Sequence, residues 1–294
     1  LNKHQGTVRS ETAGTGFALL PFLGAGHHHR AGKYQAVISK GIDWLIKHQK
    51  KTGELSQHHG NHRMYSHGLA SIALCEAFGL SKDARLRGPA QKALDFIVQA
   101  QHRSTGGWRY NPGETGDTSV FGWQIMALKS GQIAGLKVPN DTFVKAQKWL
   151  KRVEVTREPG TFGYVGRSAS PPMTAQGLLC LQFMGEKRST PRQKSGQAYL
   201  MRYPVTKPGG TSYYWYNATQ VLYHLQGEAW KKWNDSLRDV LVKSQIPNGQ
   251  HAGSWHPRDQ FERSGGRIMA TSLRLLMLEV YYRHLPLYQA LATN

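Results

Sequence analysis

Two acidic side chains at the start of an apolar segment carry the clearest chemical potential in this sequence. Glu114 and Asp117 lead into the apolar stretch that ends at Gly131. A carboxyl group in this position can accept hydrogen bonds from the free amides of a helix N-terminus, which is the ordinary role of an N-cap. A carboxyl group kept protonated by its surroundings could also act as an acid toward a ligand. Asp117 is therefore a candidate cap and a candidate catalytic acid, and the two roles are compatible.

Histidines gather at two places in the chain, at His27–His29 and at His58, His59, His62 and His67. The first group follows two glycines and is expected in a solvated loop. The second group leads into an apolar segment, where a neutral imidazole could serve as a ligand or a base, so His67 is a second catalytic candidate. Because neither group has a carboxylate or cysteine at metal-ligand spacing, we expect no metal site.

Aromatic and guanidinium groups form two further clusters. The run Tyr213–Tyr216, together with Trp123, offers π faces that could stabilise cations or stack on sugar rings. Four consecutive rings cannot all face one cavity, so part of the run must pack elsewhere. Arg263 and Arg267 flank Ser-Gly-Gly and could clamp a phosphate or carboxylate, or they could be solvated residues of a glycine turn.

The overall charge is strongly basic, because 38 Lys and Arg outnumber 18 Asp and Glu, for a net +20. Such a charge favours polyanions, phosphate groups or anionic lipid surfaces as partners. The basic residues are dispersed and do not alternate with aromatic residues, so we expect no specific nucleic-acid partner, while contact with a membrane surface stays open. No apolar run approaches the roughly 20 residues that a membrane span needs, and no signal-type segment is present, so the compartment is undetermined.

Similar apolar segments recur six times along the chain. Each begins with small or polar residues and most end near a glycine; they are Thr12–Gly26, Tyr65–Leu80, Asp117–Gly131, Pro172–Gly185, Tyr214–Gly227 and Ile268–Tyr282. Amphipathic segments with a charged face separate them: Tyr34–Lys50, Lys82–Gln101, Asp141–Val153, Pro191–Met201 and Trp230–Gln245. Cys75 and Cys180 lie inside apolar segments and are expected to be buried free thiols.

This alternation predicts an all-α protein with two concentric rings of helices. A helix that is apolar on nearly every side must be covered on every side, whereas an amphipathic helix needs cover on one face. The sequence therefore predicts an α/α toroid of about six helix pairs, formed as a single domain over residues 1–294. Because six inner segments are matched by five outer ones, we expect a sixth outer helix before Leu1, in a longer parent chain.

The segments that leave the outer helices share a degenerate pattern, in which Gln follows the helix and Gly then precedes an aromatic residue. It is seen at Gln49-x3-Gly53-x-Leu55, at Gln101 with Gly107-Trp108, at Gly160-Thr-Phe162-Gly163-Tyr164 and at Gln245 with Gly253-Ser-Trp255. This pattern resembles the QW repeat of the terpenoid cyclase and protein prenyltransferase superfamily, and of bacterial squalene-hopene-cyclase-like proteins in particular. The resemblance extends from about Thr12 to Tyr288.

The resemblance has implications for the acid and for cofactors. In squalene cyclases the proton donor is the middle Asp of an Asp-x-Asp-Asp-Thr-Ala motif at an inner-helix N-terminus. The matching stretch here is Gly116-Asp117-Thr118-Ser119, which keeps only Asp117 of the acidic group. Protein prenyltransferases hold zinc with an Asp-x-Cys pair, which this chain lacks. The resemblance therefore implies no metal, and no cofactor is expected.

In such a ring the inner helices run in the same direction, so their positive N-terminal ends share one rim. Residues at these ends are expected to line the mouth of a central cavity. The candidates for ligand binding are Tyr65, Trp108, Glu114, Ser119, Trp123, Arg167, Tyr214, Trp215, Arg263 and Arg267. The expected partner is a small apolar or anionic ligand.

Three functions follow from this arrangement, and the lining of the cavity separates them. A closed apolar cavity favours binding of an isoprenoid-type ligand, with terpenoid cyclisation as the associated activity. An open polar groove favours a lyase or glycosidase that acts on an acidic polysaccharide through Tyr214, His67 and Arg267. A filled centre favours a non-catalytic scaffold.

Overall fold

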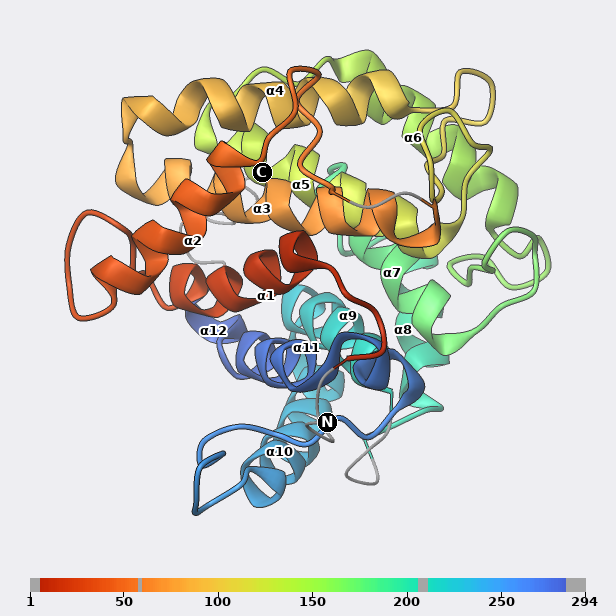
Figure 1. Cartoon of the computed structure of the whole chain (residues 1–294). Coiled ribbons are helices and arrows are strands. Elements are labelled where there is room, and N and C mark those ends of the chain that lie inside the picture. The colour runs from red at the N-terminus through yellow and green to blue at the C-terminus, as the bar shows by residue number, and fades with distance from the viewer. Residues whose placement is uncertain (1–5, 58–59, 206–210, 284–294) are drawn as a thin grey trace.

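The computed structural model describes residues 6–57, 60–205 and 211–283. Over these residues the chain forms twelve α-helices and one short 3-10 turn, Gly60–His62 (Figure 1). None of the described helices is long and apolar enough to cross a membrane. The predicted all-α class is confirmed.

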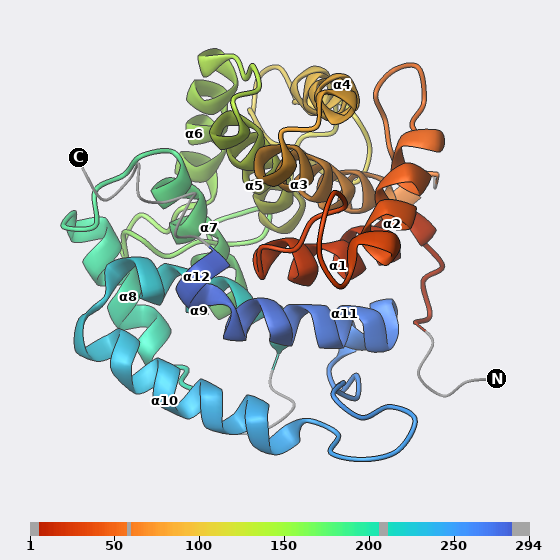
Figure 2. The ribbon, with the colours of Figure 1, turned by 90° about the vertical axis from the view of Figure 1, so that its left-hand side faces the viewer.

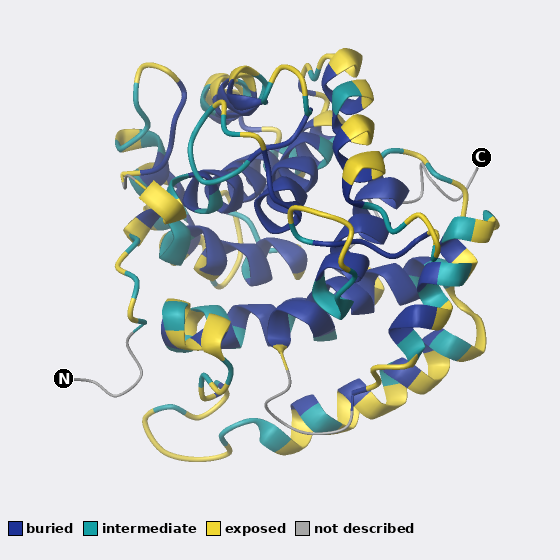
Figure 3. Cartoon of the chain, turned by 90° about the vertical axis from the view of Figure 1, so that its right-hand side faces the viewer, coloured by how far each residue is buried: buried dark blue, intermediate teal, exposed yellow. Residues whose placement is uncertain are grey.

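Six helices form a closed inner ring. They are α1 (Glu11–Gly24), α3 (Arg63–Ser81), α5 (Thr118–Ala134), α7 (Pro171–Phe183), α9 (Ser212–Leu225) and α11 (Gln260–Leu278). Each packs against the next, and α11 returns to pack against α1. Inner helices such as α5 and α7 are buried on nearly all sides, which explains why their segments lack a polar face (Figure 3).

The amphipathic segments lie outside this ring as α2 (Gln35–Lys47), α4 (Ala84–Ala100), α6 (Asn140–Val153), α8 (Pro191–Met201) and α10 (Gly227–Ser244), as Figure 2 shows. In α6, for example, Phe143, Trp149 and Leu150 are buried while Lys148 and Lys151 are exposed. The predicted α/α toroid is therefore confirmed. The short helix α12 (Val280–Arg283) follows α11, and the sixth outer helix expected before Leu1 stays a prediction.

The last inner helix begins earlier than the sequence indicated. The prediction placed its start at Ile268, whereas α11 begins at Gln260 and is interrupted at Gly266, whose φ of 70° and ψ of −160° are not helical. The first part of α11 is held by the chain near the N-terminus, because the Thr7 and Val8 amides donate to the Arg263 and Ser264 carbonyls at 3.1 and 3.0 Å. The stretch Gln260–Gly265 is thus a separate short segment at the rim.

The Gln-and-Gly pattern has a structural role in the connections. The Gln101 side chain, at the end of α4, donates to the Gly106 carbonyl of its own loop at 2.9 Å and to the Thr142 carbonyl of α6 at 3.0 Å. Trp108 then donates its indole N–H back to the Ile97 carbonyl of α4 at 2.7 Å. In this connection the pattern therefore joins the loop to the outer helices on either side of it.

Candidate functional site

A cavity of about 500 Å³ opens at one end of the ring. Its walls come from the first turns of all six inner helices, and from the segments that precede α1, α3, α5 and α7. This confirms that the N-termini share one rim and that residues near them line a cavity. The volume lies within the range of roughly 300–1,000 Å³ that is typical of small-molecule sites.

The wall of the cavity is mainly apolar and aromatic. The residues that give it this character are Phe17, Leu69, Tyr110, Trp123, Tyr164, Met173, Tyr213, Phe261, Ile268 and Met269. Among the described residues that line the cavity, none is Asp, Glu, Lys or Arg. The high net charge of the protein is therefore carried outside the described wall.

The inner end of the cavity is closed by aromatic packing. Trp123 stacks on Tyr216 with ring centroids 5.8 Å apart and an interplanar angle of 14°. Beyond Tyr216, the buried Arg283 side chain donates to Glu76 at 2.9 Å and to the Tyr216 hydroxyl at 3.3 Å. The ring is thus hollow at its N-terminal rim and filled toward its C-terminal end.

Glu279 lies next to this buried pair and gives a pH-dependent prediction. It is 6% exposed, and burial raises its pKa from 4.5 to about 7, with the charge of Arg283 opposing the shift and that of Glu76 reinforcing it. Since the folded-state pKa is the higher one, Glu279 does not destabilise the fold below about pH 4.5, where it is protonated in both states. The free energy of unfolding then falls as the pH rises to about 7, because the unfolded chain ionises more readily. The loss amounts to about 3 kcal/mol.

We therefore expect Glu279→Gln to raise the Tm by about 5 °C at pH 8 and to leave it unchanged at pH 4. Thermal denaturation of both proteins at the two pH values measures this difference. Glu228→Gln removes an exposed carboxylate from α10 and serves as the control. A Glu279→Gln protein with the parent Tm at pH 8 would contradict the assignment of a buried, uncompensated carboxyl group.

Asp117 is the N-cap of α5 and lies behind the cavity wall. Its Oδ1 accepts hydrogen bonds from the Ser119 and Val120 amides at 2.9 and 2.8 Å and from the Ser119 hydroxyl at 2.7 Å. Its Oδ2 is buried, has no hydrogen bond of normal geometry and lies 3.9 Å from Arg109 Nε. Burial raises the pKa of Asp117, opposed by the Val120 amide and by the hydroxyls of Ser119 and Tyr164. The cap predicted from the sequence is present, and the carboxyl group is connected to the cavity wall through the hydroxyls of Ser119 and Tyr164.

Three hydroxyl pairs bring polarity to the wall. Tyr65 pairs with Ser119, Tyr110 with Tyr164 and Ser10 with Ser66, and all six of these residues line the cavity. Tyr65 and Tyr164 have pKa values well above the ordinary value for tyrosine, mainly because they are buried. These hydroxyls therefore act as neutral hydrogen-bonding groups.

Three of the predicted ligand-binding residues line the cavity, namely Tyr65, Ser119 and Trp123. Seven others lie outside its described wall. The Tyr214 hydroxyl shares its one proton between the Leu200 and Tyr203 carbonyls, each 3.0 Å away, on the outer side of the ring. Trp215 is buried. The predicted sites therefore include several residues that pack the fold.

The remaining five lie in the outer part of the rim. Trp108 is 1% exposed and holds its loop against α4. Glu114 accepts a hydrogen bond from Asn111 at 2.8 Å, and Arg167 donates to the Arg152 carbonyl at 3.2 Å. The last two members of the set are arginines of α11: Arg263 is exposed, and Arg267 donates to the Ser254 hydroxyl at 3.0 Å.

His67 is part of the packing between inner and outer rings. It is fully buried, accepts a hydrogen bond from the Leu55 amide at 3.1 Å, and its Nε2 lies 3.1 Å from the Ala93 carbonyl of α4. Burial lowers its pKa to about 4. It does not belong to the described wall of the cavity, and these contacts describe a neutral histidine that supports the fold.

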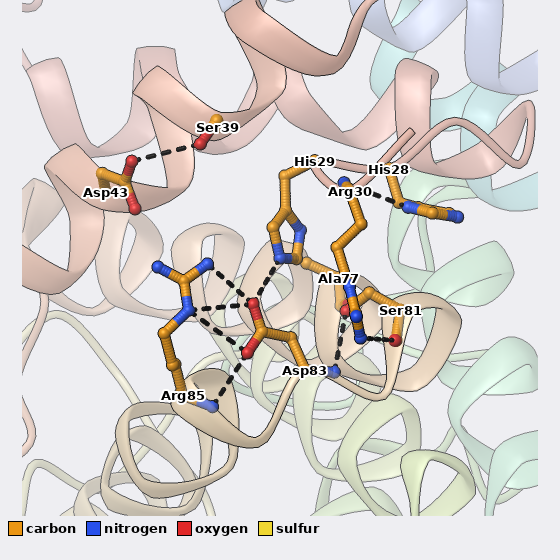
Figure 4. A network of polar contacts seen from close by, with 9 residues as sticks. All are labelled: His28, His29, Arg30, Ser39, Asp43, Ala77, Ser81, Asp83 and Arg85. Atoms are coloured by element: carbon orange, nitrogen blue, oxygen red, sulfur yellow. Dashed lines mark hydrogen bonds and ion pairs between the residues drawn. The ribbon is translucent and has the colours of Figure 1, made fainter. Parts of the chain in front are cut away.

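The first histidine group differs from the solvated loop that was expected. His29 is 5% exposed, and its Nε2 lies 2.8 Å from Asp83, the N-cap of α4 (Figure 4). Arg85 binds the same carboxylate, and this interaction together with the hydrogen bond to His29 holds the pKa of Asp83 well below its usual range. His29 thus anchors the α1–α2 connection to the next helix pair.

The described residues contain no group of three or more His, Cys, Asp or Glu that could hold a metal ion. His58 and His59 of the second histidine group lie outside the described residues. Cys75 and Cys180 are buried free thiols, as expected, and burial raises the pKa of Cys180 to about 12.

Sequence reasoning missed several residues of the wall. Phe17, Leu69 and Met173 lie in the predicted inner helices but carry no polar group that would mark them as a site. Phe261 and Ser264 were missed because the start of α11 was placed too late. Phe17, Leu69 and Met173 could have been found from their positions, because each is an apolar residue near the start of a predicted inner helix.

No protein-family model and no curated protein matches this sequence. Solved structures do match. Cellobiose 2-epimerase from Bacillus thermoamylovorans has a TM-score of 0.67 at 9% identity, over 95% of this chain and 89% of that one. An α-1,6-mannanase from Salegentibacter has a TM-score of 0.63 at 11% identity, over 92% and 89%.

A type II terpene cyclase from Scytonema, solved with geranylgeranyl dihydroxybenzoate, has a TM-score of 0.56 at 15% identity, over 92% of this chain and 87% of that one. The identities are low, so these similarities concern the fold. The chain is an α/α toroid of the kind found both in terpene cyclases and in enzymes of carbohydrate metabolism.

Proposed function

We propose that this protein binds an apolar ligand of the isoprenoid class in the cavity at the toroid rim. The observation that supports this function is the lining of the cavity: aromatic and aliphatic side chains make up most of the wall, and its described residues include no carboxylate. Burial of an isoprenoid chain here would contribute a favourable free energy of roughly 25 cal/mol per Å² of apolar surface. It would carry no cost from desolvating a Lys, Arg, Asp or Glu side chain, because the described wall contains none.

The second candidate, a carbohydrate enzyme, is favoured by the fold similarity to the epimerase and the mannanase. Glycoside hydrolysis ordinarily uses two carboxyl groups, about 5 to 9.5 Å apart. The mannanase has been studied as an inactive variant in which two consecutive aspartates are replaced, whereas this sequence has no two consecutive acidic residues. Tyr214, His67 and Arg267, which this function would use, each bond to a different part of the scaffold. The chemistry of the cavity wall therefore favours an isoprenoid ligand over a carbohydrate substrate.

Cyclisation is a finer proposal than binding and would require a proton donor at the cavity. Asp117 contacts the cavity through the Ser119 hydroxyl, which donates to Asp117. Delivery of a proton to an alkene through Ser119 would require this hydrogen bond to reverse. We therefore propose ligand binding as the function of the cavity, and the catalytic role of Asp117 stays a prediction.

Titration calorimetry with farnesol and with α-1,6-mannotriose tests the proposed function. We expect farnesol to bind and mannotriose to give no heat of binding at the same concentration. Binding of mannotriose alone would overturn the proposal in favour of the carbohydrate enzyme, and binding of neither would leave the scaffold interpretation.

Gly14 offers a variant that blocks the cavity without disturbing the fold. It lies in α1 and lines the cavity, and a Cβ placed on it would meet nothing within 4 Å. Gly14→Phe should therefore lower the affinity for farnesol at least tenfold while the Tm stays the same or rises, because glycine is a poor helix former. Ala18→Phe, on the exposed face of the same helix, is the control and should bind as the parent does. Unchanged affinity in Gly14→Phe would place the ligand elsewhere.

A further inference from the structure

The hydrogen bonds of Tyr65 have a fixed direction. Asp117 Oδ1 accepts from two backbone amides and from the Ser119 hydroxyl. An oxygen that accepts from two amides is an acceptor whether the carboxyl group is ionised or carries its proton on Oδ2. The single proton of Ser119 is therefore committed to Asp117, and the hydroxyl pair of Ser119 and Tyr65 requires Tyr65 to be the donor.

Tyr65 consequently has no proton left for a ligand. A tyrosine hydroxyl has one proton, and Tyr65 gives it to Ser119, so only the lone pairs of its oxygen remain available. No other described hydrogen bond to this oxygen is present that would use them. Tyr65 and Ser119 both line the cavity, so their hydrogen bond lies at its wall.

Tyr213 likewise donates its hydroxyl proton within the protein. Its hydroxyl donates to Gln176 Oε1 at 2.7 Å and lies 3.4 Å from the Ser119 carbonyl. Its proton is likewise directed into the protein, although Tyr213 lines the cavity. Neither Tyr65 nor Tyr213 therefore has a hydroxyl proton free for a ligand.

We propose that the preferred ligand is an isoprenoid alcohol, whose free hydroxyl donates a hydrogen bond to Tyr65. This inference rests on the proposed function and specifies its substrate class. A phosphate or carboxylate head group would be attracted by the positive helix N-termini, but the described wall has no Lys or Arg to pair with it. Its oxygens are acceptors and would gain nothing from the acceptor oxygen of Tyr65. An ammonium head group would meet six helix N-termini, which disfavour positive charge.

The experiment compares farnesol, farnesyl methyl ether and farnesyl diphosphate by titration calorimetry. The three share one hydrocarbon chain and differ in their ability to donate. We expect farnesol to bind about fivefold more tightly than the methyl ether, which is the range for one neutral hydrogen bond. Farnesyl diphosphate should bind more weakly than farnesol.

Two variants test the direction of the hydrogen bonds rather than the presence of a polar wall. Tyr65→Phe should remove the preference for the alcohol over the ether. Ser119→Ala should free the Tyr65 proton, so the ether, which can only accept, should gain about fivefold while Asp117 continues to cap α5. Tyr34→Phe, outside the cavity, is the matched control and should keep the parent ratio.

The outcomes separate the two proposals. If none of the three farnesyl compounds binds, the proposed function fails and the inference fails with it. If the ether or the diphosphate binds the parent protein as tightly as farnesol does, the inference is overturned while isoprenoid binding stands. A Ser119→Ala protein that loses affinity for all three compounds equally would also overturn it.

Discussion

Arg274→Met is expected to lower the free energy of unfolding by about 4 kcal/mol. Arg274 and Glu262 form an ion pair in α11 whose side chains are only 3% and 0% exposed. Arg274 also donates to the Ala270 carbonyl at 3.0 Å, and Glu262 accepts from the Arg258 amide at 2.7 Å. Removal of the guanidinium leaves a buried carboxylate without its counter-charge, which is far costlier than loss of the pair as a whole.

The same variant should weaken ligand binding, because the ion pair joins the two halves of α11 across Gly266. The half that contains Glu262 also supplies Phe261 and Ser264 to the cavity wall. We expect the affinity for farnesol to fall together with the stability. Urea denaturation and calorimetric titration measure the two effects.

The double variant Glu262→Gln/Arg274→Met leaves no buried charge and should recover much of the lost stability. Arg238→Met, which breaks an exposed pair with Asp235, should cost no more than about 0.5 kcal/mol. A loss below 1 kcal/mol for Arg274→Met, or no recovery in the double variant, would show that the pair does not hold α11 together.

The ring could be predicted because burial on all sides and burial on one face leave different sequence patterns. The direction of individual side chains could not. Successive residues of a helix point about 100° apart, so Tyr213 lines the cavity while Tyr214, the next residue, packs on Trp233 of α10 with ring centroids 5.7 Å apart. That rotation is set by contacts with α8 and α10, which no local pattern records.

The start of α11 was predicted too late for a related reason. Glu262 and Arg263 are charged, and the Gly265-Gly266 pair is typical of a turn, so the segment had no apolar periodicity. Glu262 is buried because Arg274, twelve residues later, neutralises it. A pair at that separation, across a non-helical residue, lies outside the i, i+3 and i, i+4 spacings that a helix pattern can reveal.

The glycines of the connecting loops show what the recurring pattern encodes. Gly53, Gly106 and Gly160 have φ values of 91°, 73° and 85°. A Cβ on each would lie 2.1, 1.9 and 2.1 Å from a backbone carbonyl oxygen of the next outer helix. Each loop therefore approaches the neighbouring helix more closely than any side chain allows, at a conformation that favours glycine.

Gly106→Ala should consequently lower the free energy of unfolding by about 4 kcal/mol, from a left-handed residue and from displacement of α6 at Lys145. Gly113→Ala, in the same connection at a φ of 76° but with nothing within 4 Å, should lose only about 1 kcal/mol. Urea denaturation of the two proteins gives the difference directly. Equal losses would mean that the backbone conformation alone requires glycine at Gly106. A larger loss for Gly106→Ala would show that the close approach of the loop to the helix requires glycine at this position. The same requirement would explain why glycine recurs in connections that have no tryptophan.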